Sequence, residues 1–546
     1  MKLYKSAILL VLMSVLILPG CDKGGSQSKS KAPSQSEPQY VPIDLNGKDV
    51  YEVDEFYFSD DFYDEKEIHT AAQKEYLSYK GDYSTIDPSL YPDGMQHLSD
   101  PLAVTLEWTY DLIDEDRDFK GYSVIFGQEE DLSDGYELKG SKQSKINIYN
   151  SYLGTNYFRV VARYADDYIE CSPIYSYDVD ATAPRNLKID GMTNCRDMGG
   201  RRTVDGGMIK QGLIYRTSAP KSWGNGRAVV PDTLTDAGKE ELLNHLGVKT
   251  EIDVNNSGSN NVPVENYQGC YMYYDSGIHH LYRNTEPLKK VFHILSDKNN
   301  YPVFYHCRIG TDRTGLCAIM ISSLLGLPEN EIYKDYLFSN FGNIQEKRYI
   351  GERAGRDNIQ VYMEALKTFP GEKLQNKVYN FLLSIGIPAA ELDSIIDILT
   401  EGTKATGNKN NQLVVTGEGF TASGSTRNTS SDQKHPAVYY TLGAGQSVTA
   451  TFNVTEARDY TVIAYFGSTN TSESLKMNQS VSAQVDGSAI TVPSTSFHDM
   501  GFGTSDNGRT YYSPLMIQVK AFTAGSHTVT ISGLANNLNI GAIALI

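Results

Sequence analysis

A cysteine and an arginine separated by five residues are the residues of this sequence best suited to do chemistry. Cys307 follows the short apolar run 301–305, and Arg313 opens a stretch in which large apolar residues recur at helical spacing up to Gly326. The chain between them therefore turns from strand to helix. This geometry directs backbone N–H groups and the positive end of a helix dipole towards one point. The sequence predicts a loop that binds a phosphate dianion.

A thiol in this loop can act as a nucleophile. A helix N-terminus and the guanidinium of Arg313 both depress the pKa of Cys307, which favours the thiolate at neutral pH. Arg313 can hold two phosphoryl oxygens in its planar fork, and Thr314 can hydrogen-bond the departing thiolate. His306 is expected to support the loop. An inert buried thiol would explain neither the arginine nor the glycines. The substrate-binding positions of the loop are Arg308, Ile309, Gly310 and Thr311.

The Cys-x5-Arg signature followed by Thr-Gly resembles that of the protein tyrosine phosphatase superfamily. Asp312 before the arginine marks a bacterial subgroup of tyrosine and phosphoinositide phosphatases. Three further blocks resemble the subgroup in family order, at residues 194–218, 247–254 and 335–340. The resemblance implies an α/β phosphatase domain that forms a phosphocysteine intermediate and needs no metal or organic cofactor.

The same resemblance assigns roles to residues outside the loop. In the first block it implies that Arg216 contacts the substrate and that Asn194 supports the loop. Arg196 and Asp197 are expected to form an ion pair that braces it.

Two aspartates compete for the role of general acid. Asp253 stands where the subgroup carries an active-site aspartate, but it could equally cap the following turn. Asp312 abuts Arg313 and the helix start, which favour its charged form and make it a poorer proton donor. Asp253 is therefore slightly favoured.

Two departures from the subgroup bear on the substrate. Thr311 stands where a lysine is usual, and Asn255 stands where an arginine is usual, so two cations are missing. Both departures favour phosphotyrosine in proteins over phosphoinositides. Two alternatives stay open, an inositol phosphate or phosphoinositide phosphatase with the same mechanism, and a non-catalytic surface protein that binds phosphate or glycans.

Composition and charge limit the possible partners. A chain of 546 residues is too long for one hydrophobic core, so a multidomain protein is expected. With 49 Lys and Arg against 67 Asp and Glu, the net charge of -18 argues against nonspecific nucleic-acid binding. The cysteines lack the spacing of a zinc site or a disulfide framework, and Cys195 and Cys317 are expected in the core.

The first residues indicate the compartment. Lys2 and Lys5 precede an apolar run that ends Leu-Pro-Gly-Cys21, which resembles the bacterial lipoprotein box. Residues 1–21 are thus expected to be a signal peptide, with Cys21 lipidated and the protein held at the membrane outside the cytoplasm. The alternative is an uncleaved N-terminal anchor. Residues 22–94 are expected to form a flexible tether and an irregular acidic region.

Two β-sandwiches are expected to flank a central α/β domain over residues 184–400. Short alternating runs in residues 95–182 resemble a fibronectin type III domain, and a spacer is its expected role. After a polar linker at 401–411, residues 412–546 resemble a galactose-binding-like jelly roll of the carbohydrate-binding-module type. The candidate sugar-stacking residues are Tyr439, Tyr440, Tyr511 and Tyr512, although tyrosines at alternate strand positions also pack into cores.

Overall fold

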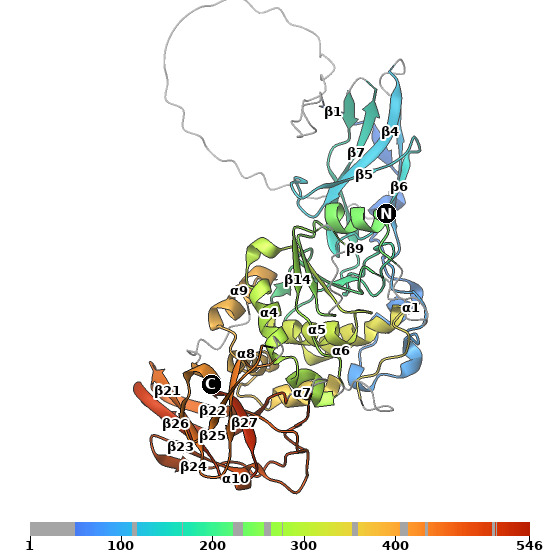
Figure 1. Cartoon of the computed structure of the whole chain (residues 1–546). Helices are drawn as coiled ribbons and strands as arrows, with labels where there is room; N and C mark the ends of the chain where they lie inside the picture. Colours follow the sequence, from blue (N-terminus) through green and yellow to red (C-terminus); the bar gives the residue numbers. More distant parts are fainter. Residues whose placement is uncertain are drawn as a thin grey trace, which may run out of the picture.

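The computed structural model describes residues 50–111, 117–165, 168–221, 233–255, 262, 264–275, 277–351, 359–404, 413–431, 435–504, 508 and 510–546. The chain forms a β-sandwich, a central α/β domain and a second β-sandwich, in this order (Figure 1). The expected signal segment, Cys21 and most of the 401–411 linker lie outside the described residues. Of the helices in the described ranges, none is long and apolar enough to cross a bilayer.

Two sheets make up the N-terminal sandwich. One contains β1 (Val50–Glu52), β8 (Ile169–Cys171), β7 (Gly154–Tyr164), β4 (Phe119–Gly127) and β5 (Tyr136–Lys139), with β9 (Tyr175–Val179) paired to β7. The other contains β2 (Phe56–Phe58), β3 (Val104–Tyr110) and β6 (Lys145–Ile148). In β3 buried and exposed residues alternate strictly, as in a strand with one face on a core. Trp108 lies in that core.

The boundary expected at residue 95 is wrong. Strand β1 pairs in parallel with β8, and β2 pairs with β3, so the sandwich begins within the segment expected to be irregular. The helical turns that follow, η1 (Asp60–Tyr63), α1 (Ala71–Leu77), η2 (Tyr83–Thr85) and η3 (Pro88–Leu90), are also ordered elements. Tyr76 and Tyr83 are buried in the core of the central domain. The Tyr76 hydroxyl donates to the carbonyl of Lys334 at 2.7 Å.

The central domain is built on a five-stranded sheet in the order β10 (Arg196–Asp197), β12 (Ile214–Thr217), β15 (Val303–His306), β13 (Thr250–Asp253) and β14 (Asn266–Gly269). All pairs are parallel except β10 with β12. Strands β12, β13 and β15 are buried throughout, as expected of parallel strands covered on both faces. A small ribbon joins β11 (Met208–Ile209) to β16 (Thr400–Glu401).

Helices pack around this sheet. They are α2 (Asp236–Glu240), η4 (Glu241–His245), α3 (Gly277–Tyr282), α4 (Thr285–Leu295), η5 (Lys298–Asn300), α5 (Asp312–Leu324), α6 (Glu329–Phe338), η6 (Ser339–Phe341), α7 (Ile359–Lys367), α8 (Leu374–Ser384) and α9 (Ala389–Leu399). Every residue of α5 from Thr314 to Leu324 is buried, so this helix is the central pillar of the domain.

The C-terminal sandwich also has two antiparallel sheets. One contains β19 (Thr426–Thr429), β20 (Val438–Leu442), β27 (Leu538–Leu545), β22 (Arg458–Gly467) and β25 (Ser513–Phe522), with β17 (Leu413–Thr416) paired to β27. The other contains β18 (Thr421–Ser423), β21 (Ser447–Val454), β26 (Gly525–Gly533), β23 (Val481–Val485) and β24 (Ser488–Ile490). Two short turns, η7 (Gly417–Gly419) and α10 (Met477–Ser480), complete it. This two-sheet architecture confirms the expected β-sandwich.

The four tyrosines proposed to stack on a sugar do not form an exposed platform. Tyr440 is buried in the core of the sandwich. Tyr511 and Tyr512 belong to the large hydrophobic core of the central domain, and Tyr439 packs against it. Tyr439, Tyr511 and Tyr512 are covered because one sheet of the sandwich packs against the central domain (Figure 1).

Candidate functional site

The loop that carries Cys307 lies at the carboxyl end of β15, and helix α5 begins at Asp312. Strand β15 is held between the parallel strands β12 and β13, so the start of the loop is fixed on both sides. Ligands of α/β proteins bind at this end of parallel strands. Cys307 is 1% exposed. The strand and the helix expected on either side of the loop are confirmed.

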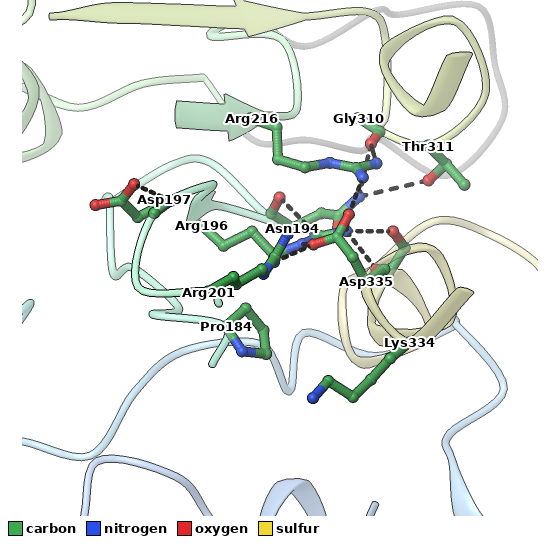
Figure 2. Close-up of polar contacts among 12 residues, drawn as sticks. Pro184, Asn194, Arg196, Asp197, Arg201, Arg216, Gly310, Thr311, Lys334 and Asp335 are labelled. Atoms are coloured by element: carbon green, nitrogen blue, oxygen red, sulfur yellow. Dashed lines mark hydrogen bonds and ion pairs between the residues drawn. The ribbon is translucent and has the colours of Figure 1, made fainter. Parts of the chain in front are cut away.

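Asn194 holds the loop from behind. Its Nδ2 donates to the carbonyls of Ile309 and Gly310, both at 3.1 Å. In a trans peptide the C=O and the next N–H point in opposite directions, so the N–H groups of Gly310 and Thr311 point away from Asn194. Gly310 has φ +72°, and a Cβ there would lie 2.5 Å from the carbonyl oxygen of Thr217. The loop thus needs glycine at position 310, where the contacts from Asn194 and Arg216 reach it from behind (Figure 2).

Three buried guanidinium nitrogens of the loop and of the first turn of α5 have no hydrogen-bond partner within the described residues. They are Nε and Nη2 of Arg308 and Nε of Arg313. An unpaired buried donor costs about 1–3 kcal/mol. Donors gathered in one loop at a helix N-terminus fit an anion such as phosphate.

The surroundings of Cys307 favour its thiolate. Burial alone would raise the pKa of the Cys307 thiol, but the positive charge of Arg313 opposes this, as do the hydroxyl and the backbone N–H of Thr314. The negative charge of Asp312 acts in the same direction as burial, yet the net pKa lies below that of an ordinary thiol. The thiolate is therefore more populated near neutral pH than that of an ordinary cysteine.

The other thiols of this domain have a raised pKa, in contrast to Cys307. Burial raises the pKa of Cys270 to about 12 and raises the pKa of Cys195 and Cys317 further. All three side chains are buried in hydrophobic clusters. Cys195 and Cys317 are core residues, as expected.

Arg313 is half-buried, and Asn255 positions it. Its Nη2 donates to the side-chain oxygen of Asn255 at 2.6 Å, and its Nη1 donates to the carbonyl of the same residue at 3.3 Å. The guanidinium also lies 6.0 Å from the ring of Tyr274, which is 50% exposed. Asn255, which lacks the charge of the arginine usual at its position, thus fixes the guanidinium of the loop.

His306 is linked to a carboxylate that the sequence analysis did not identify. Its Nδ1 lies 3.1 Å from the carbonyl oxygen of Cys307, and its Nε2 lies 3.0 Å from Oε1 of Glu251. Both side chains are fully buried. Burial lowers the pKa of His306, but its contact with Glu251 outweighs this and leaves the pKa raised. A glutamate inside the buried strand β13 was the signal available in the sequence.

Asp253 makes the turn-capping contact considered as the alternative to catalysis. Its Oδ1 accepts the backbone N–H of Asn255 at 2.7 Å, and its Oδ2 accepts the hydroxyl of Tyr267 at 3.0 Å. The residue is fully buried and lies opposite His306 in the register of β13 with β15. A role as proton donor stays a prediction.

Asp312 is bound to an arginine distant in sequence. Nε and Nη2 of Arg348 donate to its two carboxylate oxygens at 3.1 and 3.3 Å. The two side chains are 9% and 6% exposed. This bidentate contact engages both oxygens of the Asp312 carboxylate.

The ion pair expected between Arg196 and Asp197 does not form. These residues are neighbours in β10, where consecutive side chains point to opposite faces. Asp197 instead pairs with Arg185 at 2.9 Å and accepts the backbone N–H groups of Gly199 and Gly212. Arg196 points to the other side.

That other side holds a cluster in which three arginines surround Asp335 of α6. Arg196 donates to its carboxylate at 2.9 Å, and Arg201 and Arg216 also pair with it (Figure 2). Burial opposes the charge of Asp335, but the three guanidiniums hold its pKa well below the usual range. We name this set the Asp335 cluster.

Arg216 connects the cluster to the loop. Its Nη2 donates to the carbonyl of Gly310 at 2.9 Å, and the residue is fully buried. The expected substrate contact of Arg216 stays a prediction; in this structure its Nη1 binds Asp335 and its Nη2 binds the back of the loop. Arg216 positions the loop, as does Asn194.

No group of three or more histidine, cysteine, aspartate or glutamate side chains in the described ranges is placed to hold a metal ion. The donors of the loop are N–H groups, guanidiniums and a hydroxyl, which suit an anion.

Comparison with known proteins bears on the central domain. Residues 187–273 and 259–401 match the model of the tyrosine phosphatase family. The central domain is accordingly a phosphatase-family domain. A relative from Cupriavidus necator, named "Putative tyrosine-protein phosphatase", is 25% identical over 190 residues, which cover 29% of this chain and 65% of the relative. The chain thus spans less than two thirds of the length of this relative.

Solved structures are similar to individual parts of the chain. The core catalytic domain of the PP-IP phosphatase SIW14 from S. cerevisiae is 15% identical, with 28% of this chain and 79% of that chain covered and a TM-score of 0.19. A family 35 carbohydrate binding module from Clostridium thermocellum is 14% identical, with 25% and 98% covered and a TM-score of 0.20. Likenesses at these TM-scores support no conclusion about substrate or ligand.

Proposed function

We propose that the central domain is a cysteine-dependent phosphomonoesterase whose preferred substrate is phosphotyrosine in proteins. The observation that carries the proposal is the lowered pKa of a buried thiol, Cys307, at the base of a loop with unpaired donors on Arg308 and Arg313. A nucleophile beside an anion site is the minimum that phosphoryl transfer through a covalent enzyme intermediate requires.

In the first step the Cys307 thiolate attacks phosphorus. The sulfur–phosphorus bond forms as the bond from phosphorus to the ester oxygen breaks. Arg313 and the outward N–H groups of the loop stabilise the charge on the non-bridging oxygens, because their positions are fixed before substrate arrives. Asn255 holds the guanidinium of Arg313, and Asn194 holds the carbonyls of the loop.

A carboxylic acid must protonate the leaving oxygen, and we assign this role to Asp253. Both carboxylate oxygens of the competing Asp312 are engaged by Nε and Nη2 of Arg348, so neither oxygen is free to face the leaving group. Asp253 lies at the carboxyl end of β13, next to the loop, and accepts hydrogen bonds from an amide N–H and a phenol.

In the second step water attacks the phosphocysteine. The Asp253 carboxylate accepts a proton from the water, the sulfur–phosphorus bond breaks, and inorganic phosphate and the thiolate are formed. The Thr314 hydroxyl stabilises the departing sulfur. Water is the sole co-reactant, so the alcohol and phosphate account for all atoms of ester and water.

Two positions favour phosphotyrosine over phosphoinositides. Thr311 and Asn255 take the places of a lysine and an arginine, which lowers the positive charge available for a polyphosphorylated headgroup. The exposed ring of Tyr274 beside Arg313 offers an apolar wall to an aromatic ester.

The nucleophile can be tested by exchanging the thiol for a hydroxyl. We expect Cys307→Ser to reduce hydrolysis of p-nitrophenyl phosphate to the uncatalysed background while binding of the ester persists, because the anion site remains. Cys171→Ser, which alters a thiol buried in the N-terminal sandwich, is the matched control and should retain turnover. Substantial turnover by Cys307→Ser would refute the mechanism. Vanadate should inhibit the wild type, whereas EDTA should not.

The proposal includes attachment of the protein to a membrane outside the cytoplasm through lipidated Cys21. In that compartment the substrate must be an extracytoplasmic phosphoprotein. Incorporation of labelled palmitate into the wild type, and its loss in Cys21→Ser, is the expected result. Equal labelling of both forms would reject the anchor.

A further inference from the structure

Arg308 is a charged residue of the loop that no step of the proposed mechanism uses. It follows Cys307 directly, at a Cα separation of about 3.8 Å. Its Nε and Nη2 are buried and have no hydrogen-bond partner within the described residues. A guanidinium that is partly desolvated and unpaired is costly, which points to a ligand that pairs with it.

The other arginines around the loop each have a side-chain partner within the protein. Arg313 is held by Asn255, Arg348 by Asp312, and Arg216 by Asp335. Arg308 has neither an ion pair nor an asparagine that holds its guanidinium in the part of the chain that the structure describes.

A second cation accompanies Arg308. The backbone N–H of Ala219 donates to the carbonyl of Arg308 at 3.1 Å, which brings the segment after β12 alongside the loop. Lys221 lies two residues further on, is exposed, and likewise has no ion pair within the described ranges. The segment that carries Lys221 therefore runs beside the backbone of Arg308.

We propose that Arg308, assisted by Lys221, binds a second anionic group of the substrate beside the phosphate that is hydrolysed. The preferred substrates are then phosphomonoesters that carry a neighbouring carboxylate or phosphate. This inference rests on the proposed phosphatase function and refines it. The loop amides and Arg313 bind the scissile phosphate, so the guanidinium of Arg308 can bind the second anionic group.

The inference modifies the conclusion drawn from Thr311 and Asn255. Those positions remove two cations from the places where the subgroup carries them. Arg308 and Lys221 restore two cations at a different place, on the side of the loop next to Ala219. The protein is therefore expected to select a second anion by its position relative to the scissile phosphate.

Two phosphotyrosine peptides that differ only in a flanking Glu or Gln provide the test. We expect wild-type kcat/KM to be about tenfold or more higher for the Glu peptide, since a charge-assisted hydrogen bond is formed in one case only. The difference should reside mainly in KM and should shrink as NaCl is raised from 50 to 500 mM. Arg308→Gln should bring the ratio of the two peptides close to one, and Arg308→Lys should restore part of it.

The control is Arg202→Gln, which removes an exposed arginine without an ion pair in the described ranges and outside the loop. It should leave the peptide ratio unchanged. Inositol hexakisphosphate forms the second arm, since its second anion is a phosphate. Loss of discrimination in Arg308→Gln on either arm supports the inference and identifies the source of the anion.

Two results would overturn it. One is a wild-type ratio near one on the peptides together with no effect of Arg308→Gln on inositol hexakisphosphate. The other is a uniform loss on all substrates, which would assign Arg308 to the scissile phosphate or to folding. Failure of the proposed function is distinguishable, because the wild type would then fail to hydrolyse p-nitrophenyl phosphate at all.

Discussion

Asp335→Asn is the substitution whose effect can be worked out most directly from the structure. It removes one negative charge from among Arg196, Arg201 and Arg216, whose side chains are at most 2% exposed. Breaking a buried ion pair by removing one partner costs about 3–5 kcal/mol. A domain unfolds with about 5–15 kcal/mol, so this is a large part of its stability.

The predicted change can be measured by calorimetry. The central domain and the C-terminal sandwich share a core and together have about 350 residues, so at about 2.1 cal/mol/K per residue a loss of about 3–5 kcal/mol lowers Tm by about 4–7 °C. The transition that contains the central domain should shift by that amount. Activity should fall as well, because Arg216 loses the partner that aims it at the Gly310 carbonyl.

The control and the pH dependence sharpen this prediction. Asp236→Asn removes an exposed ion pair with Lys239 and should leave Tm unchanged. Since the pKa of Asp335 is depressed in the folded state, its contribution is present above the unfolded value of about 3.9 and is lost only as pH falls through the folded pKa. The difference between wild type and variant should therefore be constant from pH 5 to 8.

A double variant tests the electrostatic explanation itself. Arg201→Gln added to Asp335→Asn removes one of the cations left unpaired, so part of the lost stability should return. A shift below 2 °C for Asp335→Asn, or simple additivity in the double variant, would show that the reasoning about buried charge is wrong.

Three further predictions concern the site. Asp253→Asn should slow phenyl phosphate about a hundredfold more than p-nitrophenyl phosphate, whose leaving group needs little protonation, and if only Asp312→Asn shows this dependence the assignment is reversed. Brief iodoacetamide treatment at pH 7 should alkylate Cys307 and abolish activity, because burial raises the pKa of the other thiols of the domain; mass mapping that finds Cys307 unmodified would contradict its lowered pKa. Glu251→Gln should lower the pKa of His306, since the imidazolium loses the carboxylate that favours its positive charge, and an NMR titration with an unchanged His306 pKa would reject this link.

The core of the site could be read from the sequence because its parts are local. An apolar run followed by a helical pattern fixes the strand, the loop and the helix, so Cys307 and Arg313 must lie close together. Asn194 was recognised because its motif resembles a known block. The contact that Asn255 makes with Arg313 was missed, since the sequence reveals only that a cation is absent there.

Contacts between distant segments could not be predicted. Nothing near Asp335 in the sequence indicates that it pairs with Arg196, and nothing near Arg348 indicates Asp312. Strands β1 and β2 were missed because each has three residues, too few for alternation to be recognised, and β1 pairs with a strand more than a hundred residues away. Alternation also does not specify which partner covers Tyr511, and here it is another domain.

The contact between the C-terminal sandwich and the central domain affects how the protein can evolve and be engineered. Tyr465, Tyr511, Tyr512, Ala544 and Ile546 of the sandwich share one continuous hydrophobic core with the phosphatase-family domain. The Tyr465 hydroxyl also hydrogen-bonds Ser384 of α8 at 2.5 Å. A Cβ on Gly501 would lie 2.8 Å from the side chain of Ile278 in α3.

Domains that share a core lose independence. Denaturant should therefore melt the two as one cooperative unit, in contrast to modules joined by a flexible linker. Recombination that exchanged this sandwich for another of the same architecture would expose the apolar face of the phosphatase-family domain and favour aggregation. Selection must then act on the pair of domains together, so a glycan-binding role of the sandwich would have to be compatible with its packing against the central domain.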